Sequence, residues 1–178
     1  ISPIILLIKN HYNTSSNEVQ LSITIYLVAI CISQIFWGPL SDLIGRRRVL
    51  IIGASLFSLG GILASLNLAF EVFVFFRFLQ GVGAADCLSM PRVMLTESYG
   101  VKKAAAKMST LLAFMAIFPI LSAAFGGYIG ENYGWQINFL ALFIFGGIVL
   151  SLNYVYSPET IKNITNKLTF TKTFLDFR

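Results

Sequence analysis

Residues 38–50 read Gly38-Pro39-Leu40-Ser41-Asp42-Leu43-Ile44-Gly45-Arg46-Arg47-Arg48-Val49-Leu50. They form a short, strongly basic turn that separates two long apolar runs. Because Lys and Arg collect in the cytoplasmic loops of membrane proteins, such a turn is typical of a cytoplasmic connection between two membrane-spanning helices. The turn therefore predicts one span on each side of it.

The composition is that of a membrane protein. Hydrophobic residues make up 56% of the 178 residues, and charged residues make up only 12%. A soluble domain carries about 25% charged residues, so this chain lacks the polar side chains to cover a surface that faces water. The formal net charge of +5 comes from basic residues in the predicted loops. That charge predicts an orientation in the membrane, and no nucleic-acid partner is expected.

Four charge-free runs are long enough to cross a bilayer as helices, for which about 20 apolar residues are needed. They lie between Glu18 and Asp42, Arg48 and Glu71, Lys107 and Glu131, and Glu131 and Glu159. A fifth apolar stretch, 72–95, is interrupted by charges and is interpreted as a helix with functional polar residues inside it. The sequence thus predicts an all-α membrane protein with spans at about 19–41, 49–69, 72–95, 108–130 and 136–156. Residues 1–8 are too short to span and are interpreted as the end of a further helix.

The distribution of Lys and Arg predicts the orientation of these spans. With five spans, every basic-rich segment falls on one side of the membrane, namely Arg46 to Arg48, then Lys102, Lys103 and Lys107, and finally Lys162, Lys167, Lys172 and Arg178. The loops of the other side hold a single Lys. We expect a multi-pass protein of the inner (cell) membrane, with the basic loops and the carboxy-terminal segment in the cytoplasm.

Two motifs carry a family resemblance. Residues 38–50 resemble the signature between helices two and three of the major facilitator superfamily, G-x-L-a-D-r-x-G-r-k-x-x-l, with matches at Gly38, Leu40, Asp42, Gly45, Arg46, Arg47 and Leu50. Residues 77–85, which read RFLQGVGAA, resemble the fourth-helix pattern of that family, R-x-x-q-G-x-g-a-a. The resemblance implies the amino-terminal six-helix half of the family's fold, with helix one mostly missing. Residues 1–160 would form the transmembrane bundle, and 161–178 would begin the cytoplasmic linker.

Further residues resemble one branch of that family. Tyr26, Gln34 and the Ser-Pro-Glu-Thr run at 157–160 are similar to the bicyclomycin-resistance branch of the drug:proton antiporters. This implies proton-coupled efflux of drugs or small organic solutes by alternating access, with the lipid bilayer, the substrate, protons and the carboxy-terminal half of the transporter as partners. The antiporter motif of helix five, G-P-x-x-G-G, corresponds to residues 122–127, which read SAAFGG and keep only the glycine pair.

Three polar residues of the 72–95 helix are candidates for proton coupling or for the substrate cavity. A charge inside an apolar span is costly unless it faces the bundle interior and has a partner, so Arg77 is expected to face inward. Gln80 lies on the same helical face, three residues on. Asp86 follows Arg77 by nine residues, about half a turn out of phase, and so cannot pair with it along the helix. Both charged residues have a second interpretation: Arg77 as a purely structural group bound to carbonyls, and Asp86 as a tolerated substitution.

The basic turn has two interpretations that are compatible. It sets the topology, and the family resemblance implies a cytoplasmic gate made by Gly38, Asp42, Gly45, Arg46 and Arg47. In that gate Asp42 would engage neighbouring charges and a helix end of the other half of the transporter. From their location alone, Arg92 and Glu97 are expected to pair with Asp42 across helices.

Small residues and prolines predict the packing of the bundle. Gly81 allows close contact between helices. Pro91 and Pro119 each remove a backbone hydrogen bond and predict kinks, and the Gly126–Gly127 pair adds flexibility near the end of its helix. Trp37, Tyr133 and Trp135 lie near span ends and are interpreted as anchors at the membrane interface.

Two functions of different classes stay open at this point. The first is half of a secondary transporter, and the second is a non-transporting protein, either a truncated remnant or a membrane assembly subunit of a transporter. An enzyme is not expected, because the sequence holds no nucleotide-binding loop and no arrangement of a nucleophile with its base. For the same reason no cofactor is expected, and no Cys or His spacing predicts a metal site.

Overall fold

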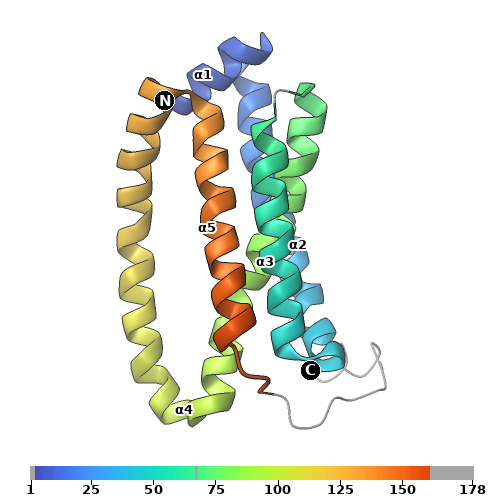
Figure 1. Cartoon of the computed structure of the whole chain (residues 1–178), viewed down its shortest axis with the longest axis vertical. Helices are drawn as coiled ribbons and strands as arrows, with labels where there is room; N and C mark the ends of the chain where they lie inside the picture. Colours follow the sequence, from blue (N-terminus) through green and yellow to red (C-terminus); the bar gives the residue numbers. More distant parts are fainter. Residues whose placement is uncertain (1–2, 67, 161–178) are drawn as a thin grey trace.

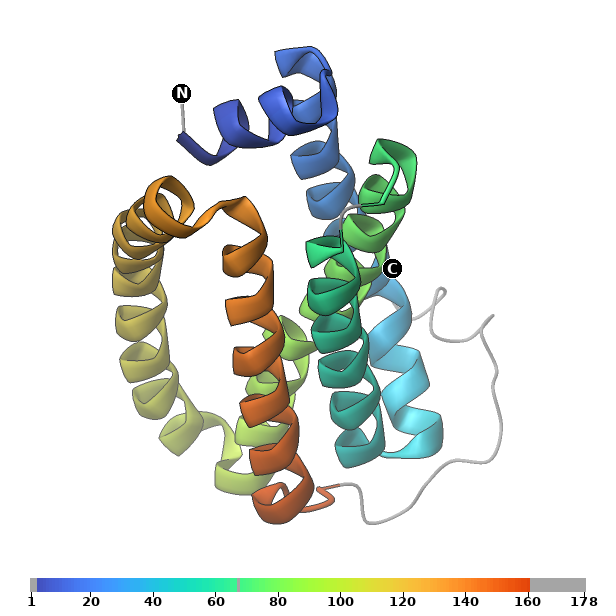
Figure 2. The same ribbon diagram turned by 45° about the horizontal axis from the view of Figure 1, so that its top comes forward.

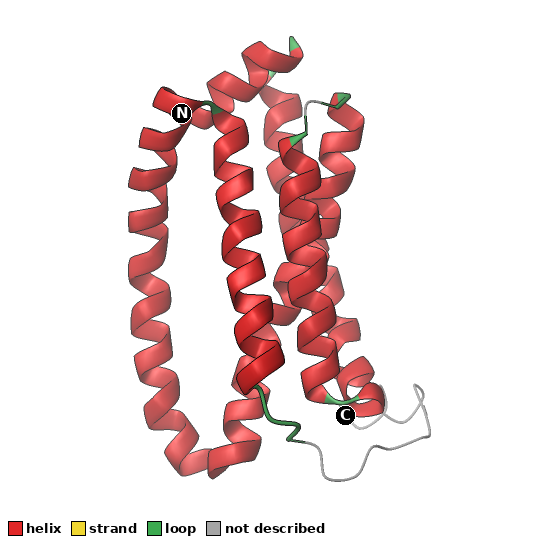
Figure 3. Ribbon diagram, viewed as in Figure 1, coloured by secondary structure: helices red, strands yellow, loops and turns green. Residues whose placement is uncertain are grey.

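The computed structural model of the protein describes residues 3–66 and 68–160, which form five helices and no strand (Figure 3). The helices are α1 (Pro3–Tyr12), α2 (Ser16–Ile44), α3 (Arg46–Ser65), α4 (Phe70–Tyr133) and α5 (Trp135–Tyr156). The prediction of an all-α membrane fold is confirmed, whereas the count of six helices is not confirmed by the five that are found. The predicted start of the linker at 161–178 lies outside the described residues.

Helix α4 is a single helix by hydrogen bonding but crosses the bundle twice. Its 64 residues would extend for about 96 Å if straight, whereas a bilayer core is about 30 Å thick. The backbone leaves helical geometry at Gly100, with φ 71° and ψ 160°, and there the chain doubles back (Figure 1). We call residues 70–99 the first arm of α4 and residues 101–133 its second arm. The chain stays helical through Pro91 and Pro119, so the sharp turn of α4 comes from a glycine and not from either proline.

The segment 96–107, expected as a loop, is helical on both sides of Gly100. Its three consecutive alanines and three lysines are strong helix formers, which explains why the helix continues to within one residue of the turn. Helices α2, α3, α4 and α5 are each long and apolar enough to span a membrane. With the two arms of α4 counted separately, five long helical segments run along the bundle.

Helix α3 packs against α4 and against α5, and Figure 1 shows it beside α5. Two buried clusters fill the bundle, one around Phe73, Trp135 and Phe139 and one around Trp37 and Met90. Helix α1 lies across the end of the bundle that holds the first cluster, as the view with that end tilted forward shows (Figure 2).

The two tryptophans are part of these clusters, so their interpretation as interface anchors is wrong. Trp37 is 5% exposed and donates from Nε1 to the carbonyl oxygen of Val82 at 2.9 Å, which ties α2 to the first arm of α4. Trp135 is also buried, and Phe73 and Phe139 meet it edge to face. Tyr133 is exposed, as an anchor would be. Position in the sequence locates a span end but does not tell which face of the helix a side chain occupies.

Candidate functional site

Arg77 lies on the first arm of α4 and is held by an amide and two aromatic rings. Its Nη1 donates to Oε1 of Gln80 at 2.5 Å. The guanidinium carbon lies 4.3 Å from the ring centre of Tyr26 on α2 and 5.3 Å from that of Phe139 on α5. Ring faces attract a desolvated cation, so these contacts lower the cost of placing this charge inside the bundle. Arg77 therefore faces the bundle interior, as its sequence predicts.

Gln80 is completely buried, and α3 makes room for it with two glycines. A Cβ atom on Gly60 would lie 2.8 Å from Cα of Gln80, and one on Gly61 would lie 3.4 Å from its Nε2. While Oε1 accepts from Arg77, Nε2 has no hydrogen-bond partner among the described residues. The amide oxygen of Gln80 fixes the orientation of Arg77. The amide nitrogen stays unpaired and leaves a hydrogen-bond donor beside the guanidinium group.

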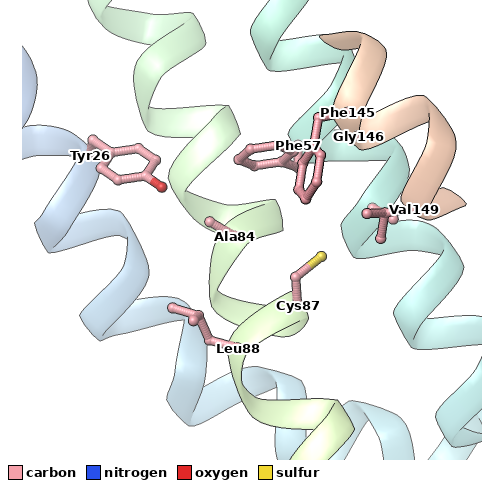
Figure 4. A pocket seen from close by; sticks show the side chains of 9 residues that line it. Tyr26, Phe57, Ala84, Cys87, Leu88, Phe145, Gly146 and Val149 are labelled. Atoms are coloured by element: carbon pink, nitrogen blue, oxygen red, sulfur yellow. The ribbon is translucent and has the colours of Figure 1, made fainter. Parts of the chain in front are cut away.

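One apolar cavity is lined by Arg77 itself, and a second is lined by Tyr26, the ring on which Arg77 lies. A cavity of about 220 Å³ is lined by Arg77 together with residues of α1, α2 and α5, among them Ile8, Ser22 and Phe139. A second cavity of about 340 Å³ lies between α2, α3, the first arm of α4 and α5 (Figure 4). Figure 4 shows the Tyr26 ring on one side of it and the rings of Phe57 and Phe145 on the other. Tyr26 is shared, because its ring face holds Arg77 while its side chain lines the second cavity.

Asp86 is not part of this arrangement. It is completely buried, but it faces α3 at Gly53, where a Cβ atom would overlap its carboxyl group. The half-turn offset from Arg77 that the sequence predicts is thus present in the structure. Of the three residues proposed together for coupling or the cavity, the structure brings Arg77 and Gln80 into contact and leaves Asp86 on another face.

At the opposite end of the bundle from α1, Arg46 joins three chain segments. Its Nη2 lies 2.7 Å from Oδ1 of Asp42 and 3.0 Å from Oε1 of Glu97, and its Nη1 also donates to Ser41. The expected pairing of Asp42 with Arg92 and Glu97 is therefore wrong. Arg46 lies between the two carboxylates, whereas Arg92 contacts the sulfur of Met115 on the second arm of α4 at 3.9 Å.

The segment that follows α5 contacts this cluster, and the sequence does not reveal this contact. Glu159 accepts hydrogen bonds from the backbone N–H groups of Arg46 at 2.9 Å and Arg47 at 3.3 Å, so its carboxylate caps the start of α3. Thr160 donates to Glu97. Gly45 is required here, since its φ is +98° and a Cβ atom on it would lie 2.5 Å from Oε2 of Glu159. We call Ser41, Asp42, Arg46, Glu97, Glu159 and Thr160 the basic-end cluster.

The remaining candidates are packing positions. A Cβ atom on Gly81 would lie 2.5 Å from the carbonyl oxygen of Tyr26, so Gly81 allows the close contact of α2 with α4. The carbonyl oxygen of Gly126 accepts from Nδ2 of Asn138 at 3.1 Å, which joins the second arm of α4 to α5. Gly38 has no atom within 4 Å of its Cβ position in the described part of the chain, so it serves no close contact within this bundle.

Comparison with known proteins agrees with this architecture. A family profile described as the Major Facilitator Superfamily matches residues 1–177. The chain is 31% identical over 148 residues to the multidrug resistance protein MdtL of Escherichia coli O81 (strain ED1a), a match that covers 83% of this chain and 38% of that protein. MdtL of Shigella boydii serotype 18 (strain CDC 3083-94 / BS512) is 30% identical with the same coverage. The chain thus spans well under two thirds of the length of these relatives.

Proposed function

The chain belongs to the major facilitator superfamily, and on that premise we propose that it forms the amino-terminal half of a secondary transporter that exports drugs or small organic solutes in exchange for protons. The observation that carries this proposal is the Arg77–Gln80 pair inside the bundle, with Arg77 lining one apolar cavity and its ring partner Tyr26 lining a second. Intramembrane charge costs about 2.5–3.5 kcal/mol on insertion scales, and such residues mark substrate and ion pathways. The names of the relatives, multidrug resistance proteins, support a drug as substrate.

The contacts of Arg77 suit a coupling role. Within the described residues it forms no ion pair, since a neutral amide and two rings are its partners. Its positive charge is therefore available to a carboxylate of the substrate or of the second half of the transporter. In alternating access, two such halves rock about a site near the middle of the membrane, so a charge that gains and loses a partner in each cycle can link proton movement to substrate movement.

We propose that the basic-end cluster is the gate. The side chain of Arg46 is 11% exposed, whereas that of Asp42 is 56% exposed, so Asp42 can contact a neighbouring helix of the second half in addition to Arg46. Gly38 precedes Asp42 by four residues in α2, and no atom of the described residues lies within 4 Å of its Cβ position. The helix surface beside Asp42 is therefore open to a neighbouring helix. In this arrangement Arg46 joins α2, α3 and α4 at this end of the bundle, while Asp42 is the residue exposed to the second half of the transporter.

The contacts of Glu97 in the basic-end cluster predict a contribution to the free energy of unfolding that is lost in acid. Partial burial raises the pKa of Glu97, but hydrogen bonds from Thr160 and Arg46 and the charge of Arg46 outweigh it and lower the pKa below its usual 4.5. The stabilisation is therefore present above the unfolded-state pKa and is lost as the pH falls through the folded-state value. We expect Glu97→Gln to flatten the decrease in unfolding free energy below about pH 4.5, measured by denaturant titration in detergent. An unchanged acid profile in the variant would contradict this role.

We also propose that the basic end faces the cytoplasm. The test uses a background without Cys31 and Cys87, with a single cysteine at Asn17, beside the α1 end, or at Lys102, beside Gly100. A membrane-impermeant thiol reagent is expected to label Asn17→Cys in intact cells and Lys102→Cys only after permeabilisation. Labelling in the reverse pattern would show that the orientation is inverted.

Efflux from cells tests the transport function. The full reading frame is expressed in a strain that lacks its own drug pumps, and efflux of a fluorescent drug is followed with and without a protonophore. We expect efflux that the protonophore stops. A protein that inserts into the membrane at normal level but moves none of a panel of drugs would instead support the alternative, a non-transporting remnant or assembly subunit.

A further inference from the structure

Asp86 is a buried acid that is not part of the Arg77–Gln80 site. It lies on the first arm of α4 in the middle of an apolar stretch, and its side chain is 0% exposed. Neither carboxyl oxygen has a hydrogen-bond partner among the described residues. Burial of an unpaired carboxylate is among the costliest placements in a protein, whereas the neutral acid is far cheaper to bury.

The carboxyl group occupies a space that α3 provides by lacking a side chain. A Cβ atom on Gly53 would overlap the Asp86 carboxyl, and one on Gly83 would overlap the backbone of α3 at Gly53 and Phe57. Helices α3 and α4 are thus at backbone contact beside Asp86. We call this contact, residues 53–61 of α3 against 80–86 of α4, the α3–α4 seam.

No ionic partner for Asp86 comes from the packed helices. Its titratable neighbour is Cys87, the next residue of α4. Helix α3 carries no charge after Arg48, which precedes Gly53 by more than a helical turn, and α2 carries none between Glu18 and Asp42. Helix α5 carries no charge at all, and Tyr26, the titratable group of α2 in this region, holds Arg77 on the other face of α4. The seam therefore stabilises the neutral form of Asp86 and not the ionised form.

We propose that Asp86 is a proton-binding site of the α3–α4 seam: the carboxyl group keeps its proton while the seam is closed and releases it to water only when the seam opens. On release, an oxygen of Asp86 gives its proton to a water molecule and the carboxylate stays hydrated until the seam closes again. This goes beyond the proposed function, because Asp86 lies apart from Arg77 and the site does not require that the chain transports anything. A merely tolerated substitution would also hold a proton, but its ionisation would not be coupled to opening of the seam.

Infrared spectroscopy of the membrane-embedded chain tests the proton directly. The difference spectrum between the native protein and Asp86→Asn at neutral pH is expected to contain the carbonyl stretch of a protonated carboxylic acid, shifted on transfer to D₂O. Asn is nearly the same size as Asp, so the seam is preserved in this variant. A difference spectrum with carboxylate bands in place of the acid band would overturn the proposal.

Hydrogen exchange tests the coupling to the seam. Residues 49–60 of α3 are expected to exchange faster as the pH rises in the native protein, after correction for the intrinsic pH dependence of exchange, and to lose that extra dependence in Asp86→Asn. Glu97→Gln is the matched control, because it also removes a carboxylate of the first arm of α4, but one that contacts Arg46 at the basic end and lies outside the seam. If the extra pH dependence persists in Asp86→Asn, or is absent from the native protein, Asp86 does not control the seam.

Discussion

Arg77→Ala is expected to abolish drug efflux by the full protein while its amount in the membrane stays unchanged. The variant removes the charge that lies over Tyr26 and Phe139 and leaves both carbonyl and amide groups of Gln80 without partners. Loss of a buried charge relieves an insertion cost, so the helix still inserts. Efflux of a fluorescent drug and immunodetection of the membrane fraction measure the two quantities in the same cells.

Arg77→Lys is the matched control. Lysine keeps the charge but lacks the planar group that donates to Gln80 while stacking on Tyr26, so we expect efflux that is reduced but measurable. A coupling role requires that the efflux rate decreases from the native protein to Arg77→Lys and again to Arg77→Ala. Efflux at the native rate in Arg77→Ala would show that Arg77 is a structural residue and not part of the transport cycle.

Gly83→Ala is expected to destabilise the bundle strongly. Its Cβ atom would overlap the carbonyl oxygen of Gly53 and the backbone nitrogen of Phe57, neither of which can move away as a side chain can. Forcing extra volume into a packed interior costs about 1–3 kcal/mol. Thermal unfolding in detergent is expected to show a clear decrease in midpoint temperature.

Gly147→Ala provides the comparison for this change. Gly147 is also a helical glycine, but no atom lies within 4 Å of its Cβ position. Alanine favours a helix over glycine by up to about 1 kcal/mol, so this variant is expected to unfold at the same temperature or higher. Equal destabilisation by both variants would mean that the contact at the α3–α4 seam is not as close as the structure has it.

The long-range features of the sequence predicted the fold well. Charge-free runs and the two motifs predicted an all-α membrane bundle of the major facilitator type, because bilayer thickness sets the length of a span. The spacing from Arg77 to Gln80 predicted a shared face, and the spacing to Asp86 predicted a different one. These predictions depend on helix periodicity alone, which the chain obeys throughout the first arm of α4.

Contacts between distant segments could not be predicted in the same way. Glu159 caps α3 at Arg46 across 113 positions of sequence, and neither residue type nor spacing indicates such a pairing. The role of Gly53 is visible only because the structure places Asp86 against it. The burial of Trp37 could not be predicted for a related reason, because its hydrogen bond to Val82 depends on how α2 is rotated about its axis.

We propose that this chain belongs to a proton-driven exporter, and transport by the reconstituted protein tests this. The most direct measurement uses the purified product of the full reading frame in proteoliposomes, with a drug outside and a pH gradient, acid inside, imposed at time zero. We predict drug accumulation that follows the gradient, collapses when a protonophore is added and is absent from Arg77→Ala. Drug movement that is the same with and without the gradient, or no movement by a protein shown to be inserted and folded, would contradict proton-driven drug export.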